Sequence, residues 1–324
     1  MDNFTLYKKT LCFSIRKMAF DFLMLLLVAA ACVGGFLITS ASLNDGLIGL
    51  IVGLVIGLIL AGILTHFLAY VLKAGQIAMM TRGITEGELP ENVYAEGKKT
   101  VKERFLTVAA FYVVTRVIKG IFSQIGRAIN SVGRALGGET GQGIGSAVSS
   151  AIQIVVGYLC DCCLGWVFYR KDQSATRATL EGAVLFFKHG KTFLRNVGRI
   201  FGIGLLSLVV IGGAFFGISY LIFTFFPGAF AELGQTIVNA GVQLETEIPA
   251  WISNPTYLML FVAAIIGVTL WSFIHSNFIR PFILAGVLRN YIQSGVNDIP
   301  TEESFSMLDS KSKKFADLHA KMDS

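Results

Sequence analysis

Residues 46–72 read GLIGLIVGLVIGLILAGILTHFLAYVL, without a single Asp, Glu, Lys or Arg. About 20 apolar residues of α-helix are enough to cross the hydrocarbon core of a bilayer, so this stretch predicts a transmembrane helix. Gly49, Gly53, Gly57 and Ala61 recur at every fourth position and share one helix face. Small residues on one face let a neighbouring helix approach closely. We expect that face to pack within one subunit; contact between subunits and a backbone-lined pore are the alternatives.

The composition of the whole chain agrees with a membrane protein. Of 324 residues, 54% are hydrophobic and 15% are charged, and the mean hydropathy is +0.66. Soluble domains carry about 25% charged residues. The net charge of +6 comes from cations that lie beside apolar stretches, which favours contact with anionic lipid over nucleic acid. We therefore predict an all-α, polytopic bundle of transmembrane helices.

Other segments repeat the length and apolar character of residues 46–72. They are residues 18–41, 143–169, 200–226 and 257–279. The connecting segments 1–17, 73–104 and 170–199 are rich in Lys and Arg, whereas residues 227–255 contain neither. Cytoplasmic loops carry an excess of Lys and Arg, so both termini are predicted to be cytoplasmic in a protein of the plasma membrane.

This orientation requires one more crossing. Residues 73–104 and the end of residues 143–169 are both predicted on the cytoplasmic side, so the chain has to cross outward within residues 105–136. The sequence then predicts about six spans within residues 1–300, followed by a polar cytoplasmic tail at 301–324. In the alternative, residues 105–136 lie flat on the inner surface as a basic amphipathic helix and residues 143–169 re-enter the membrane.

Residues 105–136 carry a stripe of polar side chains at helical spacing. The cationic stripe consists of Arg116, Lys119, Ser123, Arg127, Asn130 and Arg134. Its opposite face is aliphatic. Cations at membrane depth face a partner, a cavity or headgroups rather than acyl chains. The stripe is the candidate contact for an anionic solute or for anionic lipid.

Asp161 lies in the predicted span 143–169, at a depth comparable to that of Arg116 in the preceding crossing. A pair between them would remove two isolated charges from the membrane together. We predict an intramembrane Arg116–Asp161 ion pair. It either holds two helices or acts as a gate or substrate counter-ion.

The two ends of the chain resemble each other. Residues 65–75 align without gaps to residues 276–286, and each copy leads to an acidic-aliphatic-proline ending, Glu88-Leu89-Pro90 or Asp298-Ile299-Pro300. Both copies run in the same direction, which favours a parallel internal repeat. Alternatively, two helix exits at the inner leaflet have converged on similar residues.

Motifs of catalysis are missing from the sequence. It contains no His-Glu-x-x-His, no nucleophile elbow and no phosphate loop with its Lys. Cys160 to Cys163 could be read as a thiolate site, but no His is adjacent in sequence. We expect no enzymatic activity, no metal site and no cofactor.

Residues 75–114, with Gly87-Glu88-Leu89-Pro90 and Gly97-Lys98-Lys99, resemble uncharacterised multi-pass prokaryotic membrane families of unknown function. The resemblance implies a multi-pass membrane fold and no particular activity. From the residues themselves we expect a channel- or transporter-type protein in which the cationic stripe lines a permeation or lipid-handling path. The alternative is a structural or scaffold subunit of a larger membrane assembly, with the stripe docked on anionic lipid or a partner. Either reading implies a homo-oligomer or a membrane complex.

Overall fold

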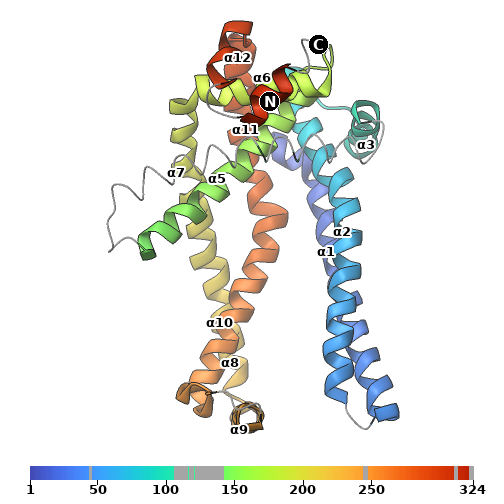
Figure 1. Cartoon of the computed structure of the whole chain (residues 1–324), viewed down its shortest axis with the longest axis vertical. Helices are drawn as coiled ribbons and strands as arrows, with labels where there is room; N and C mark the ends of the chain where they lie inside the picture. The colour runs from blue at the N-terminus through green and yellow to red at the C-terminus, as the bar shows by residue number, and fades with distance from the viewer. Residues whose placement is uncertain are drawn as a thin grey trace. The chain divides into compact units, whose positions relative to one another are not determined.

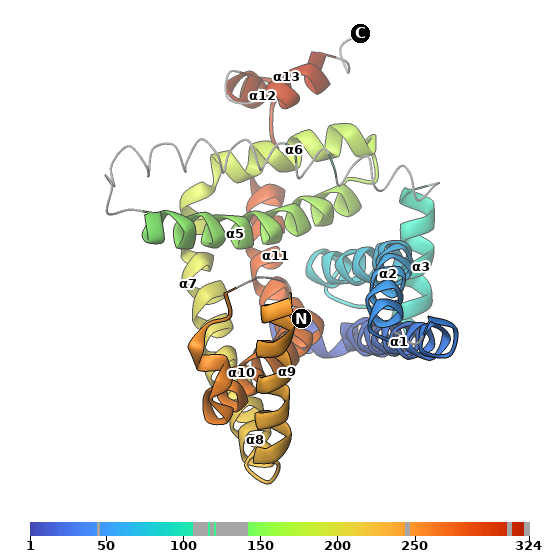
Figure 2. The same cartoon turned by 60° about the horizontal axis from the view of Figure 1, so that its bottom comes forward.

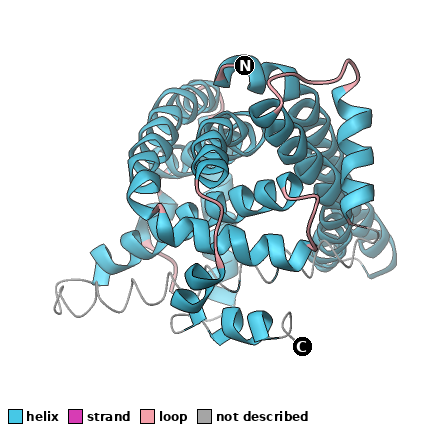
Figure 3. Ribbon diagram, turned by 90° about the horizontal axis from the view of Figure 1, so that it is seen from above, coloured by secondary structure: helices cyan, strands magenta, loops and turns pink. Residues whose placement is uncertain are grey.

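The computed structural model describes residues 1–43, 46–105, 142–243, 247–309 and 313–320, together with Arg116 and Gly120. Helices account for the regular structure of these residues, and none of them forms a strand (Figure 3). The chain divides into two compact units. One comprises Met1–Gly198 and Pro281–Ser324, the other Arg199–Arg280.

The first unit begins with a long antiparallel hairpin. Helix α1 (Asn3–Leu43) and helix α2 (Gly46–Thr85) pack along each other (Figure 1). The outward faces of residues 18–43 and 46–65 are apolar and exposed, with Leu26 and Ile59 as examples. Exposed aliphatic side chains over this length suit contact with lipid.

Glycines bring the backbones of α1 and α2 together. A Cβ at Gly53 would meet the carbonyl group of Ala31, and one at Gly49 would meet that of Gly35. Gly57 lies against Val28 on the same seam, and Ala61 is half-buried. Thr39 closes the seam, since its hydroxyl accepts from the Gly49 amide at 3.1 Å and donates to the Gly35 carbonyl at 3.1 Å.

The hairpin emerges from a compact helical base. The base comprises the start of α1, the end of α2, α3 (Val93–Arg104), α5 (Gln142–Tyr169), α6 (Ala175–Lys188) and α11 (Arg280–Asn297) from Pro281 onward. Its largest fully buried side chains include Phe13, Met79, Trp166 and Tyr291. Asn92 and Ser174 cap α3 and α6 by accepting hydrogen bonds from backbone amides of their first turns.

The polar C-terminal tail is helical. Helices α12 (Glu302–Asp309) and α13 (Lys313–Ala320) pack against α6. Phe305, Leu308 and Phe315 are buried there, and Arg177 on α6 forms an ion pair with Glu302. Three buried apolar side chains, two on α12 and one on α13, therefore anchor a segment whose average composition is polar.

The second unit is a second hairpin. The end of α7 (Gly190–Ser207) continues through the π-helical turn η2 (Leu208–Gly212) into α8 (Gly213–Phe223). Helix α9 (Pro227–Gln243) and the 3-10 turn η3 (Ala250–Ser253) lead to α10 (Pro255–Ile274), which ends in a second π-helical turn, η4 (His275–Ile279) (Figure 2). Gly212 on η2 and Gly267 on α10 allow the backbones of these two elements to come into contact. The indole of Trp271 on α10 donates to the hydroxyl of Ser207 on α7 at 3.0 Å.

Among the described residues, four helices are long and apolar enough to cross a membrane: Asn3–Ser42, Ile48–Thr65, Gly198–Phe223 and Pro255–Asn297. The predicted all-helical membrane fold is confirmed to that extent. Of residues 105–136, the structure describes Phe105, Arg116 and Gly120, so a crossing there stays a prediction. The predicted span 143–169 lies within helix α5, of which the described side chains, Gln153–Tyr169, are mostly apolar, and a crossing there also stays a prediction. Residues 158–168 of this helix are buried in the base.

One prediction concerns the joint between α11 and α12. Lys188 lies 2.6 Å from the Asp298 carboxylate and His189 lies 3.2 Å from it. The hydrogen bond from Lys188, aided by both positive charges, lowers the pKa of Asp298. A carboxylate with a lowered pKa stabilises the fold above its unfolded pKa of about 4, and that contribution is lost as the pH falls. Between pH 6 and pH 3 the wild type should therefore lose more stability than Asp298→Asn does, as measured by thermal unfolding. If the two proteins showed identical pH profiles of stability, the interaction of Asp298 with Lys188 and His189 would contribute nothing to the stability of the fold.

Candidate functional site

Arg116 is the one residue of the cationic stripe whose environment the structure describes, and it is exposed. Lys119, Ser123, Arg127, Asn130 and Arg134 lie outside the described residues. The stripe therefore stays a prediction from the sequence.

Asp161 is buried on α5, with 4% of its side chain exposed. The Nζ of Lys73 on α2 lies 2.5 Å from its Oδ1. Lys73 is the first charged residue after the apolar run of α2, which is the sequence signal that could have identified this partner. A pairing of Asp161 with Arg116 is a prediction that the described residues do not test.

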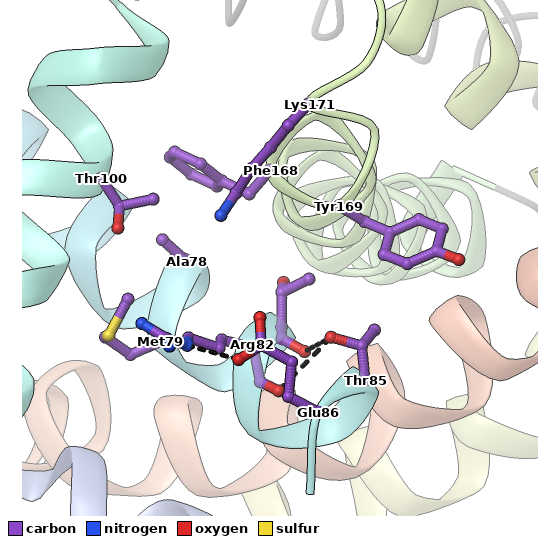
Figure 4. Close-up of a pocket in the computed structure, with 10 residues that line it drawn as sticks. Ala78, Met79, Arg82, Thr85, Glu86, Thr100, Phe168, Tyr169 and Lys171 are labelled. Atoms are coloured by element: carbon purple, nitrogen blue, oxygen red, sulfur yellow. Dashed lines mark hydrogen bonds and ion pairs between the residues drawn. The ribbon is translucent and has the colours of Figure 1, made fainter. Parts of the chain in front are cut away.

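A polar pocket of about 310 Å³ opens in the base, where α2, α3 and α5 meet (Figure 4). Its lining combines two cations, one carboxylate and three Thr hydroxyls with apolar walls. The lining residues are Ala78, Met79, Thr81, Arg82, Thr85, Glu86, Thr100, Phe168, Tyr169 and Lys171. All of them belong to the first unit.

The end of α2 builds one wall of this pocket. Arg82 is held by Glu86, with 2.6 Å between Nε and Oε2, and by Glu96 on α3, with 3.4 Å between Nη1 and Oε1. The hydrogen bond with Glu86 raises the pKa of Arg82. Just beyond α2, Gly87 has a backbone φ of +81°, a conformation that residues other than glycine rarely adopt. The chain can therefore turn sharply after Glu86 and leave this wall open.

The end of α5 builds the opposite wall. Arg104 at the end of α3 donates to the carbonyl of Arg170 at 3.0 Å and to that of Gln173 at 2.7 Å. Burial lowers the pKa of Arg104, opposed by the charge of Asp172. These two bonds hold the turn on both sides of Lys171, whose ammonium reaches into the pocket (Figure 4).

A buried carboxylate reinforces that turn. Glu181 on α6, with 2% of its side chain exposed, accepts from the Trp166 indole at 3.0 Å. The Nε of Arg170 lies 3.1 Å from the same carboxylate. A buried charge with several partners fixes the groups around it. The position of Lys171 is therefore set by α3, α5 and α6 together.

A second pocket of about 510 Å³ adjoins the first, and the two share Thr85 and Tyr169. Its remaining lining comes from the ends of α2 and α11 and includes the amides of Gln293 and Asn297. The two pockets offer charges, hydroxyls and amides side by side, an arrangement suited to holding a small polar molecule. No group of His, Cys, Asp and Glu side chains suited to a metal ion occurs among the described residues.

Sequence reasoning did not find this pocket. Arg82, Glu86 and Lys171 stand in segments that the charge pattern assigns to loops, and nothing in their spacing indicates that they meet. No family model, curated protein or solved structure matches this chain, so the interpretation of the site rests on its own residues.

Proposed function

We propose that this chain is a non-enzymatic membrane protein of the channel or transporter type, in which the cationic stripe lines a path for an anionic solute or a lipid headgroup. The observation that supports this most directly is the exposure of Arg116 in a chain with four membrane-length helices. An exposed guanidinium in such a protein needs water, a headgroup or a partner beside it. A path lined by the stripe would supply one of these.

The proposal includes about six spans with both termini in the cytoplasm, and a parallel internal repeat. In support of the repeat, matching positions of α2 and α11 are buried in the base. The pairs are Leu72 and Ile283, Ala74 and Ala285, and Gly75 and Gly286. Each copy follows a membrane-length apolar stretch. Two convergent helix exits would share the apolar stretch but have no reason to share the burial pattern.

Labelling of single cysteines tests the topology. Gly97 is unsuitable, because a side chain there would meet Phe13, whereas Lys98, Asp172 and Glu232 are exposed. In a background without the five native cysteines, Lys98→Cys and Asp172→Cys should react with an impermeant reagent from the same side of the membrane. Glu232→Cys should react from the other side. Reaction of Lys98→Cys and Asp172→Cys from opposite sides would contradict the six-span arrangement.

Flux through reconstituted protein tests the path. Liposomes carrying the wild type should leak anions in preference to cations, because the stripe is positive. Arg127→Gln with Arg134→Gln should reduce that preference without reducing membrane insertion. Lys99→Gln is the matched control, since Lys99 is exposed and has Glu103 3.9 Å away. Wild-type vesicles as tight as empty ones under several ionic gradients would reject the path.

The alternative of a structural subunit in a larger membrane assembly has its own support. Apart from the adjacent residues and backbone of its own helix, no described atom of the second unit lies within 4 Å of a Cβ built at Gly202, Gly213 or Gly217. These small residues leave room on α7 and α8 for a helix of another copy or of a partner, and anionic lipid would contact the basic segments. Tight vesicles together with a complex that Gly217→Leu disperses would favour this function.

A further inference from the structure

The polar pocket holds opposite charges on facing walls. Lys171 reaches in from the end of α5, and Glu86 stands beside Arg82 at the end of α2 (Figure 4). Lys171 forms no ion pair with a described residue. Glu86 uses one oxygen for Arg82, and its carboxylate retains further acceptor sites. The space between the walls is therefore bordered by an ammonium on one side and an available carboxylate oxygen on the other.

Further hydrogen-bonding groups line the pocket away from Lys171. Thr100 contributes from α3, whereas the hydroxyl of Thr85 donates to the carbonyls of Thr81 and Arg82. Arg82 uses Nε and Nη1 for carboxylates, which leaves Nη2 as a donor. A group with several acceptor oxygens, such as a phosphate ester, matches a lysine, a threonine hydroxyl and a guanidinium that border one space. A lone phosphate would leave Glu86 as an unfavourable neighbour.

We propose that this pocket binds a zwitterion, a phosphate ester that also carries a primary ammonium. The phosphate faces Lys171 and Nη2 of Arg82, and the ammonium faces Glu86. A volume of about 310 Å³ is at the small end of ligand pockets, which suits a headgroup-sized molecule such as phosphoethanolamine. The same chemistry occurs in the free compound and in the headgroup of an ethanolamine phospholipid. The lining of this pocket contains no residue of the cationic stripe, so a failure of one proposal does not imply a failure of the other.

Binding to the full-length protein in detergent tests the site. Titration calorimetry with O-phosphoethanolamine should give saturable binding, and inorganic phosphate or ethanolamine alone should bind at least ten times more weakly. Lys171→Gln should weaken binding of O-phosphoethanolamine at least tenfold. Glu86→Gln should reduce the difference in affinity between O-phosphoethanolamine and inorganic phosphate, because it removes the negative charge that faces the ammonium. Lys99→Gln and Glu103→Gln, on the exposed face of α3, are the matched controls and should bind as the wild type does.

Nanodiscs containing ethanolamine phospholipid, compared with discs of choline phospholipid, distinguish the two sources. If the lipid headgroup occupies the site, ethanolamine phospholipid should compete with added O-phosphoethanolamine, which would then bind more weakly in the ethanolamine discs than in the choline discs. If the free compound is the ligand, O-phosphoethanolamine should bind equally tightly in both kinds of disc. Phosphate binding as tightly as O-phosphoethanolamine would overturn the zwitterion. Absence of binding by a wild-type protein with a cooperative thermal transition would overturn the site. Each variant should show the same cooperative thermal transition in the absence of ligand, which would exclude misfolding as the cause of weaker binding.

Discussion

Lys73→Met is expected to destabilise the protein by about 3 kcal/mol, because it removes a cation from the buried carboxylate of Asp161. The two ends of this ion pair differ in exposure: 42% of the Lys73 side chain is exposed, against 4% for Asp161. Deleting the lysine leaves a charge where water has little access. Deleting the carboxylate with Asp161→Asn leaves an ammonium that can turn to solvent. The lysine variant should therefore be the more damaging of the two.

A double-mutant cycle in detergent, read by thermal or chemical unfolding, checks this order. Lys73→Met combined with Asp161→Asn should recover part of the loss, since no buried charge is left behind. The exposed pair of Lys99 and Glu103 is the control, because surface pairs contribute about 0–1 kcal/mol. If Asp161→Asn cost more than Lys73→Met, the argument from exposure would be wrong.

Gly53→Leu is expected to destabilise the α1–α2 hairpin by about 1–3 kcal/mol, the range seen when a packed interface is overfilled. The cause is geometric, since even a Cβ at this position would collide with the backbone carbonyl of Ala31. Backbone cannot move aside as a flexible side chain can. The helices would have to separate and lose the contacts along the seam.

The same helix supplies the control for this experiment. Gly62→Ala adds the same methyl group as Gly53→Ala, but no described atom outside the adjacent part of its own helix lies within 4 Å of that methyl group. Unfolding should show a loss for Gly53→Ala and none, or a slight gain, for Gly62→Ala. Equal stability of Gly53→Ala and Gly62→Ala would mean that the seam does not limit how closely α1 and α2 approach.

Hydropathy predicted the membrane-length helices well, because a lipid-facing helix must be apolar over a fixed length. It could not distinguish lipid from the protein interior. Residues 158–168 are as apolar as a span, yet the base buries them between α2 and α6. In the same way, the average polarity of the tail concealed the three apolar side chains that dock α12 and α13 on α6.

The candidate site shows where sequence patterns stop being informative. The seam glycines share one helix, so their period marks the face that packs on α1. The pocket combines Arg82, Thr100 and Lys171 from three elements, and only tertiary packing brings them together. The depth of Asp161 in a predicted span does not identify Lys73 as its partner, because depth says nothing about which helix lies beside it.

Helix α2 is continuous from Gly46 to Thr85, which at about 1.5 Å per residue makes it a rod of about 60 Å. Its membrane-length part carries the glycine seam, and its last turns carry the Arg82 wall of the pocket. A transmembrane helix adjusts its tilt when the thickness of the bilayer changes. Since the rod contains no break, a change of tilt in the bilayer moves the pocket wall as well. Bilayer thickness and binding at the proposed zwitterion site are therefore expected to be coupled through α2.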